Sequence, residues 1–173
     1  MKIAGMITVF IFCSLCGAAM GGAVKRRNEI LHEFLDLFDF FIYNLKNFGL
    51  PTERIFAMYD NGAILEESGF LSRLAASGRE GGVYRNTWVE TADFFIAENA
   101  HFNSMTDTEA EIVKGFGRNL GNSDAARQIE ICESFRAKMS DYLDAKSADF
   151  KDRIKIYRAG GALCGLFLCL LFF

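Results

Sequence analysis

Two cysteines near the N-terminus have the spacing of a redox or metal-binding pair. Cys13 and Cys16 form a Cys-x-x-Cys motif, and paired thiolates can bind a soft metal ion. A structural metal site of this type needs a second pair of ligands, and the sequence offers none at a suitable spacing. Both cysteines lie within a long apolar stretch. We therefore interpret them as small, polarizable residues of a membrane helix, and we expect no metal and no cofactor.

The remaining residues that could do chemistry form no recognisable catalytic motif. His32 and His101 have no Cys, Ser or second His at a spacing that would build a triad or a metal site. The sequence also lacks a Gly-rich phosphate loop, a Gly-x-Ser-x-Gly elbow and a His-Glu-x-x-His motif. The net charge of -3 offers no basic surface for nucleic acid. We expect a non-enzymatic interaction or scaffold protein with no small-molecule substrate, although distant carboxylates could still meet in the fold.

One helical stretch carries acidic and aromatic residues on the same face. On a helical wheel that starts at residue 25, Glu29, Glu33 and Asp36 form a stripe opposite the apolar face. Phe40 and Tyr43 fall on that same side. Exposed aromatic side chains beside acids can form a docking surface for a partner; the alternative is that a neighbouring helix covers them. For a docking surface, we expect replacement of Glu33, Asp36 and Phe40 to weaken partner binding and leave the helix content unchanged.

Charged residues are absent from both ends of the chain. No charge lies within residues 3–24 or 159–173, whereas every acid, and every Lys and Arg except Lys2, lies between them. As helices these stretches would be about 33 and 22 Å long, against a bilayer core of about 30 Å. The second is short, but a snorkelling Arg158 and local thinning can compensate. We predict an N-terminal transmembrane helix (1–24), a central domain (25–158) and a C-terminal transmembrane helix (159–173).

Basic residues flank both apolar stretches on the side of the central domain. They are Lys25, Arg26 and Arg27 after the first stretch, and Lys151, Arg153, Lys155 and Arg158 before the second. Because basic residues stay on the cytoplasmic side, we expect the central domain in the cytoplasm and both termini across the membrane. A cleaved signal peptide is the alternative for the first stretch, since Lys2 precedes it and residues 17–19 are small. The order of the charges favours a retained anchor.

Each apolar stretch carries two glycines spaced four residues apart. They are Gly17 and Gly21 in the first and Gly161 and Gly165 in the second. Small residues at this spacing let membrane helices approach closely. Such patterns are common in apolar stretches, so the sequence leaves open whether the two helices pair.

The central domain is expected to contain six helices. Apolar residues recur at three- and four-residue spacing from Ile30 to Phe48, which predicts that the first helix continues the N-terminal span with one buried face. Further helices are expected at about 51–59, 63–76 and 82–98. A fifth begins at Thr106 or Thr108, each followed three residues later by Glu, and ends near residue 120. The sixth runs unbroken from about residue 123 into the C-terminal span. The expected fold is all-α, a single bundle of about six helices flanked by two membrane helices.

The corner between the last two of these helices carries the clearest motif. It comprises Phe116, Leu120, Gly121, Ser123, Asp124 and Gln128. With Trp88, the Leu50-Pro51 step and the Arg-x-Gly-Gly-x-x-x-Gly run at 158–165, this pattern resembles the stage III sporulation protein AB family of endospore-forming Firmicutes, over essentially the whole chain. The motif also has a plain physical interpretation. Gly121 ends one helix, Ser123 or Asp124 caps the next, and Gln128 braces the loop, so we interpret it as structural.

The resemblance implies a membrane protein of the mother cell, facing the forespore. The family is similar to the inner-membrane platform F protein of type II secretion systems, which implies an F-domain-like bundle. It further implies a platform subunit of the stage III A channel that joins mother cell to forespore. The bundle would dock a secretion-type ATPase, the AA protein of the same set, and support late forespore gene expression. Platform proteins carry two tandem bundles, so a single bundle would have to form a homo-oligomer to imitate them.

Two other functions fit parts of the same sequence. A platform component of an ordinary secretion or pilus system would share the topology, and only the sporulation-type motif argues against it. A small two-span sensor would place the bundle outside the cell to bind a ligand. The basic residues on both flanks argue against that orientation.

Overall fold

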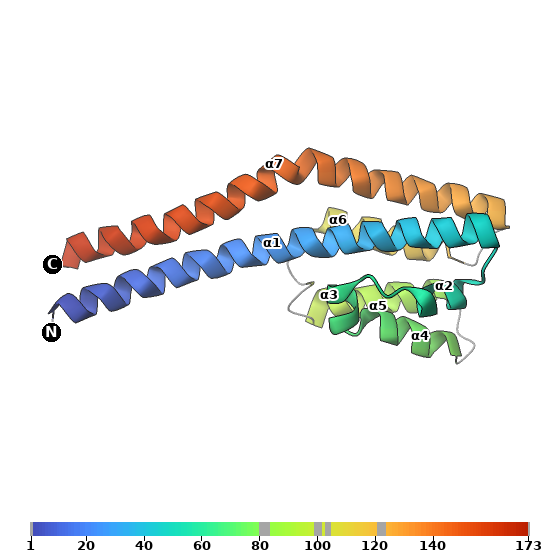
Figure 1. Ribbon diagram of the computed structural model, residues 1–173, viewed down its shortest axis with the longest axis horizontal. Helices are drawn as coiled ribbons and strands as arrows, with labels where there is room; N and C mark the ends of the chain where they lie inside the picture. Colours follow the sequence, from blue (N-terminus) through green and yellow to red (C-terminus); the bar gives the residue numbers. More distant parts are fainter. Residues whose placement is uncertain (1, 80–83, 99–101, 103–104, 121–123, 173) are drawn as a thin grey trace. The chain divides into compact units, whose positions relative to one another are not determined.

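The chain folds entirely into helices wherever the structure describes it. The computed structural model describes residues 2–79, 84–98, 102, 105–120 and 124–172, and no strand occurs in these ranges. The helices are α1 (Lys2–Phe48), α2 (Thr52–Met58), α3 (Ala63–Glu67), α4 (Phe70–Arg79), α5 (Tyr84–Glu98), α6 (Asp107–Arg118) and α7 (Ala125–Phe172) (Figure 1). The all-α class expected from the sequence is confirmed.

Contacts divide the chain into two units, which we call the apolar pair and the bundle. The apolar pair consists of Met1–Asn28 and Lys146–Phe173, and the bundle of Glu29–Ala145. Helices α1 and α7 contribute to both units. The charge pattern places the domain boundaries after residues 24 and 158. By contacts, the basic residues that flank the apolar stretches belong with the apolar pair.

The two long helices are unbroken, as the sequence predicts. α1 ends where Gly49 adopts a positive φ of 57°, and the Gly49 N–H donates to the Leu45 carbonyl over 3.1 Å. This left-handed residue closes the helix and satisfies one of its last carbonyls. Pro51, the single proline, then occupies the N-cap of α2. Backbone chemistry that is visible in the sequence therefore sets the length of α1.

The third expected helix is wrong as a single element. The structure breaks residues 63–76 into α3 and α4 at Gly69, whose φ is 85°. A residue with positive φ cannot continue a right-handed helix. The Ser68 hydroxyl donates to the Leu65 carbonyl over 2.9 Å, which satisfies a carbonyl at the end of α3. The described chain therefore has seven helices, where the sequence predicted six.

Thr106, one of the two caps expected for α6, is the one the structure uses. The Thr106 N–H donates to the Glu109 carboxylate over 2.7 Å, and the Glu109 N–H donates back to the Thr106 hydroxyl over 3.5 Å. This reciprocal capping box satisfies two N–H groups at the start of the helix. Glu109 is fully buried and also accepts from the Tyr142 hydroxyl over 2.9 Å. The cap thereby links α6 to α7.

The core of the bundle is a cluster of aromatic rings around Trp88 on α5. The Trp88 ring is fully buried. It contacts five phenylalanine rings, those of Phe34, Phe38, Phe56, Phe70 and Phe116. Aromatic pairs in such tilted and edge-on arrangements stabilise beyond the area they bury. Phe34 and Phe38 come from the apolar face predicted on α1, so this face does anchor the bundle.

That apolar face ends earlier than its spacing suggests. Burial on α1 stops at Asn44, and Leu45 is only half-buried. Phe48, expected to be buried, is 62% exposed and lies against the ring of Tyr43, with centroids 5.9 Å apart. The apolar periodicity continues to Phe48, beyond Asn44, the last residue of α1 that is buried in the bundle. An exposed aromatic pair remains on the last turns of α1.

Candidate functional site

The acidic and aromatic face of α1 borders a shallow concavity in the bundle. Asp36, Phe40 and Tyr43 line it, and its volume is about 450 Å³. Three further residues complete the lining, namely Asp39 on α1 and Tyr59 and Asn61 from the segment that follows α2. We call these six residues the α1 concavity. Tyr59 and Asn61 are missing from the surface predicted on the helical wheel because a wheel shows one helix only.

Glu33 has an internal partner and does not line the α1 concavity. Its carboxylate accepts the backbone N–H groups of Ile64 and Leu65, each over 2.9 Å. These are N–H groups of the first turn of α3, which would otherwise lack partners. Glu33 therefore caps α3 from α1. Glu29, about two turns of α1 before Asp36, is exposed and also does not line the concavity.

Tyr59 forms part of the wall of the concavity, and its surroundings change the pKa of its hydroxyl. Its ring meets Phe40 edge-on, with centroids 5.3 Å apart, and its hydroxyl donates to the Glu33 carbonyl over 3.3 Å. Burial raises the pKa of the Tyr59 hydroxyl above its ordinary value, and three carboxylates raise it further: Asp36, Glu33 and Asp60. Burial is the largest cause of this raised pKa, and only the part that comes from the three carboxylates reports a negative local potential at the Tyr59 hydroxyl.

Asp39 shares its carboxylate with an arginine of α7. The Arg136 Nε and Nη2 atoms donate to the two carboxylate oxygens over 2.8 and 3.1 Å. Both side chains are partly exposed, so the pair mainly fixes geometry and adds little stability. The hydrogen bond to Asp39 raises the pKa of the Arg136 guanidinium above its ordinary value. The two-pronged contact shows that a guanidinium fits the acidic edge of the concavity.

The motif at the corner between α6 and α7 is packed into the core on its α6 side. Phe116 is fully buried and stacks on Phe38, with centroids 3.9 Å apart, and Leu120 is fully buried. Gly121 and Ser123 lie outside the described residues. The Gln128 N–H donates to the Asp124 carbonyl over 3.0 Å. The Gln128 side chain is buried, and its Nε2 has no hydrogen-bond partner in the described chain.

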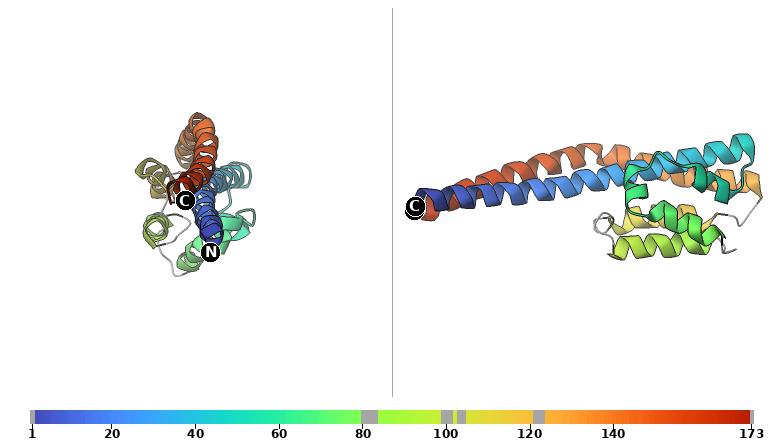
Figure 2. Two further views of the ribbon diagram at one scale, coloured as in Figure 1. Left: turned by 90° about the vertical axis from the view of Figure 1, so that its left-hand side faces the viewer. Right: turned by 60° about the horizontal axis from the view of Figure 1, so that its bottom comes forward.

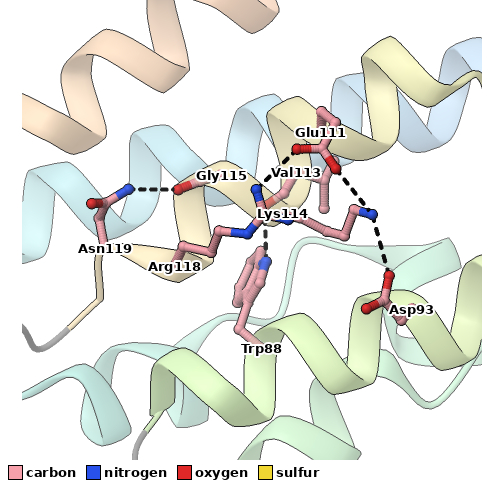
Figure 3. A network of polar contacts seen from close by, with 8 residues as sticks. All are labelled: Trp88, Asp93, Glu111, Val113, Lys114, Gly115, Arg118 and Asn119. Carbon is pink, nitrogen blue, oxygen red and sulfur yellow. Dashed lines mark hydrogen bonds and ion pairs between the residues drawn. The ribbon is translucent and has the colours of Figure 1, made fainter.

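Two glycines of α6 make room for aromatic rings, a role that the sequence motif does not reveal. A Cβ on Gly117 would overlap the Trp88 ring, and a Cβ on Gly115 would overlap the Phe135 ring. The Trp88 Nε1–H donates to the Val113 carbonyl over 2.9 Å, as Figure 3 shows. The helix backbone therefore accepts the indole directly. The sequence shows the glycines and the aromatic residues, but it does not show that Gly117 meets Trp88 or that Gly115 meets Phe135.

Polar contacts flank this indole site on α5 and α6. Figure 3 shows Lys114 between Glu111 and Asp93, at 3.1 and 3.3 Å. Arg118 donates to Glu111 over 2.9 Å, and this hydrogen bond lowers the pKa of the Glu111 carboxyl. Asn119 donates to the Gly115 carbonyl over 2.8 Å. Of these contacts only the Lys114–Asp93 ion pair joins α6 to α5, and each of the four charged side chains drawn has an ion-pair partner.

In the apolar pair, the glycines lie where the two helices meet. Figure 2 shows α1 and α7 side by side along this unit. A Cβ on Gly161 would lie 2.8 Å from the Gly17 Cα, closer than any real contact allows. A Cβ on Gly165 would be nearly as close, at 3.2 Å from the Phe10 Cα, whereas a Cβ on Gly21 would reach ordinary contact with the Ile154 carbonyl at 3.4 Å. The backbones thus approach most closely at Gly17 and Gly161.

Neither the cysteines nor His32 line the α1 concavity. Cys13, Cys16 and Cys164 are free thiols on an apolar groove of the apolar pair. His32 is exposed on α1, and His101 lies outside the described residues. No group of three His, Cys, Asp or Glu side chains that could hold a metal ion occurs in the described ranges.

Comparison with known proteins identifies a family. The family model of stage III sporulation protein AB matches residues 2–173. The chain belongs to the stage III sporulation protein AB family. No curated protein and no solved structure matches it.

Family membership and structure together support a role in stage III of sporulation and an association with membranes. The match covers both apolar ends as well as the bundle. Two helices, α1 and α7, are long and apolar enough to span a membrane. Outside the bundle, their apolar residues are largely exposed, as in Phe12, Leu15, Phe167 and Leu170. Such exposure is costly in water and favourable in lipid.

Proposed function

We propose that the chain is a non-enzymatic platform subunit of the stage III A sporulation channel. It would lie in the mother-cell membrane facing the forespore, anchored by both apolar helices. The observation that carries the proposal is the match of the sporulation family over the whole chain, apolar ends included. The basic residues beside both apolar stretches support a cytoplasmic bundle.

The proposed task of the bundle is to dock a secretion-type ATPase, the AA protein of the same set. The α1 concavity supports this task, because it combines exposed carboxylates with aromatic rings. Docking would couple the ATPase to the membrane helices, and the channel would sustain late gene expression in the forespore. Other stage III A proteins, and further copies of the chain, are the expected neighbours in the membrane.

Deletion of the gene in its own host tests the proposed function. We expect forespores that shrink after engulfment and a late forespore reporter that stays silent, both restored by the wild-type gene. In a parallel assay, the full chain in detergent should copurify with the AA ATPase. Normal spores without the gene would refute the channel role. Failure of the wild-type chain to retain the ATPase would refute the docking role.

A further inference from the structure

The α1 concavity presents carboxylates that the chain itself leaves only partly paired. Asp36 and Asp39 lie one turn apart on α1, and Asp39 binds Arg136. Asp36 has no ion pair within the described part of the chain. The six lining residues include no Lys, Arg or His. The concavity therefore has a negative charge that the residues lining it do not neutralise.

Aromatic rings line the α1 concavity beside the same carboxylates. Phe40 and Tyr59 meet edge-on in the wall of the concavity, and Tyr43 at its border is 59% exposed. From Tyr43 the aromatic surface continues to Phe48 on the last turn of α1. Large exposed aromatic side chains beside a carboxylate are typical of an interface that binds a side chain with both a charge and a flat apolar face.

We infer that the α1 concavity receives an arginine side chain of a protein partner, carried on an apolar segment that covers Tyr43 and Phe48. The inference rests on the proposed function, in which that partner is the docked ATPase. A guanidinium can fork onto the Asp36 carboxylate and stack against the rings of Phe40 and Tyr43. Lysine has no flat face and serves such a site less well.

The chain already contains the same interaction next to the concavity. Arg136 of α7 forks onto Asp39 with donor–acceptor distances of 2.8 and 3.1 Å. The adjacent Asp36 offers an equivalent carboxylate one turn away, without such a partner. An arginine from outside would pair with Asp36 as Arg136 pairs with Asp39. The apolar segment of the partner, lying over Tyr43 and Phe48, would shield that contact from water and strengthen it.

Site-specific photo-crosslinking identifies the occupant. Asn61 lines the concavity but carries neither its charge nor its aromatic surface, so Asn61→p-benzoylphenylalanine places the probe without removing either. The full chain is crosslinked in sporulating cells and the attached peptide is sequenced. We expect a segment of the ATPase that contains an arginine next to apolar residues. A crosslink to lipid, to a second copy of the chain or to a peptide without arginine would overturn the inference.

A charge swap tests the pairing itself. Asp36→Arg should lower the crosslinking yield about tenfold or more, and replacement of the identified partner arginine by Asp should restore it. Asp141→Arg is the matched control, because Asp141 is an exposed acid on α7 with no ion pair in the described chain. Equal yields from Asp36→Arg and Asp141→Arg would overturn the inference, as would a partner variant that fails to restore binding to Asp36→Arg. Unfolding curves of both variants exclude a loss of fold as the cause.

The two proposals fail in different ways. If the ATPase copurifies equally well with wild type and with Asp36→Arg, the arginine site is wrong while the platform function stands. If the expected arginine crosslink forms but deletion of the gene leaves sporulation normal, the channel function is wrong while the site stands.

Discussion

At the scale of single residues, the core depends on places where a side chain is absent. Gly117 lets the Trp88 ring lie directly on α6, and the indole N–H donates to the Val113 carbonyl. Five phenylalanine rings pack around the same indole. A buried indole also needs a partner for its N–H, and here the backbone supplies it. The glycine is thus as much a part of the aromatic cluster as the rings.

Gly117→Ala should destabilise the bundle. The added Cβ would overlap the Trp88 ring, and overpacking of a core typically costs about 1–3 kcal/mol. Urea unfolding of the full chain in detergent, followed by circular dichroism, measures the loss. In a Trp88→Ala background the same substitution should cost far less, because the ring is gone. An equal cost in both backgrounds would contradict the packing argument.

At the scale of elements, carboxylates at similar helical positions have different roles. Glu33 and Asp36 both lie on the predicted acidic stripe of α1. Glu33 caps α3, whereas Asp36 lines the α1 concavity. For a docking surface we expect replacement of Glu33, Asp36 and Phe40 to leave the helix content unchanged, but the contact of Glu33 with α3 argues against this for Glu33. Substitution of Glu33 should therefore lower the stability of the bundle, whereas substitution of Asp36 should weaken partner binding.

Glu33→Ala should weaken the fold, and Asp36→Ala should not. Loss of the carboxylate leaves the N–H groups of Ile64 and Leu65 without their partner, and loss of a helix cap costs about 0.5–2 kcal/mol. Asp36 makes no such contact, so its replacement should change stability by less than about 0.5 kcal/mol. Denaturant midpoints of the two variants give the comparison. A larger loss for Asp36→Ala would contradict these assignments.

At the scale of the whole molecule, the adjacent glycines Gly160 and Gly161 of α7 differ in the space around them. A Cβ on Gly161 would press on the Gly17 backbone, whereas a Cβ on Gly160 would meet nothing within 4 Å. Gly161→Ala should force the helices of the apolar pair apart and lower stability by about 1–3 kcal/mol. Gly160→Ala should be neutral or slightly stabilising, because alanine favours the helix. Thermal unfolding in lipid nanodiscs tests both, and equal effects would refute the close approach.

The orientation of the bundle in the membrane needs a probe at an exposed site. Cys132 is fully buried, and burial raises the pKa of its thiol to about 12, so it will not react at neutral pH. Ala126 on α7 is exposed. We expect Ala126→Cys to resist a membrane-impermeant maleimide in intact cells and to react after permeabilisation. The wild-type chain gives the background, and labelling in intact cells would place the bundle outside.

Some features of this protein were readable from local sequence alone. The uncharged ends, the unbroken length of α1 and α7 and the Thr106 cap depend on hydropathy, on the positions of glycine and proline, and on contacts within one turn. Such features are set by neighbours along the chain, so a sequence pattern can predict them.

Other features were decided only by the tertiary structure. The cap of Glu33 on α3 joins residues 31 positions apart, and the pair of Arg136 with Asp39 joins residues 97 apart. The α1 concavity exists because the segment after α2 brings Tyr59 and Asn61 beside Asp36. A helical wheel gives the face of a residue but not its partner from another element. The sequence by itself determined the helices and the membrane-compatible ends, whereas packing between distant helices decided which acids cap, which pair and which remain open to a partner.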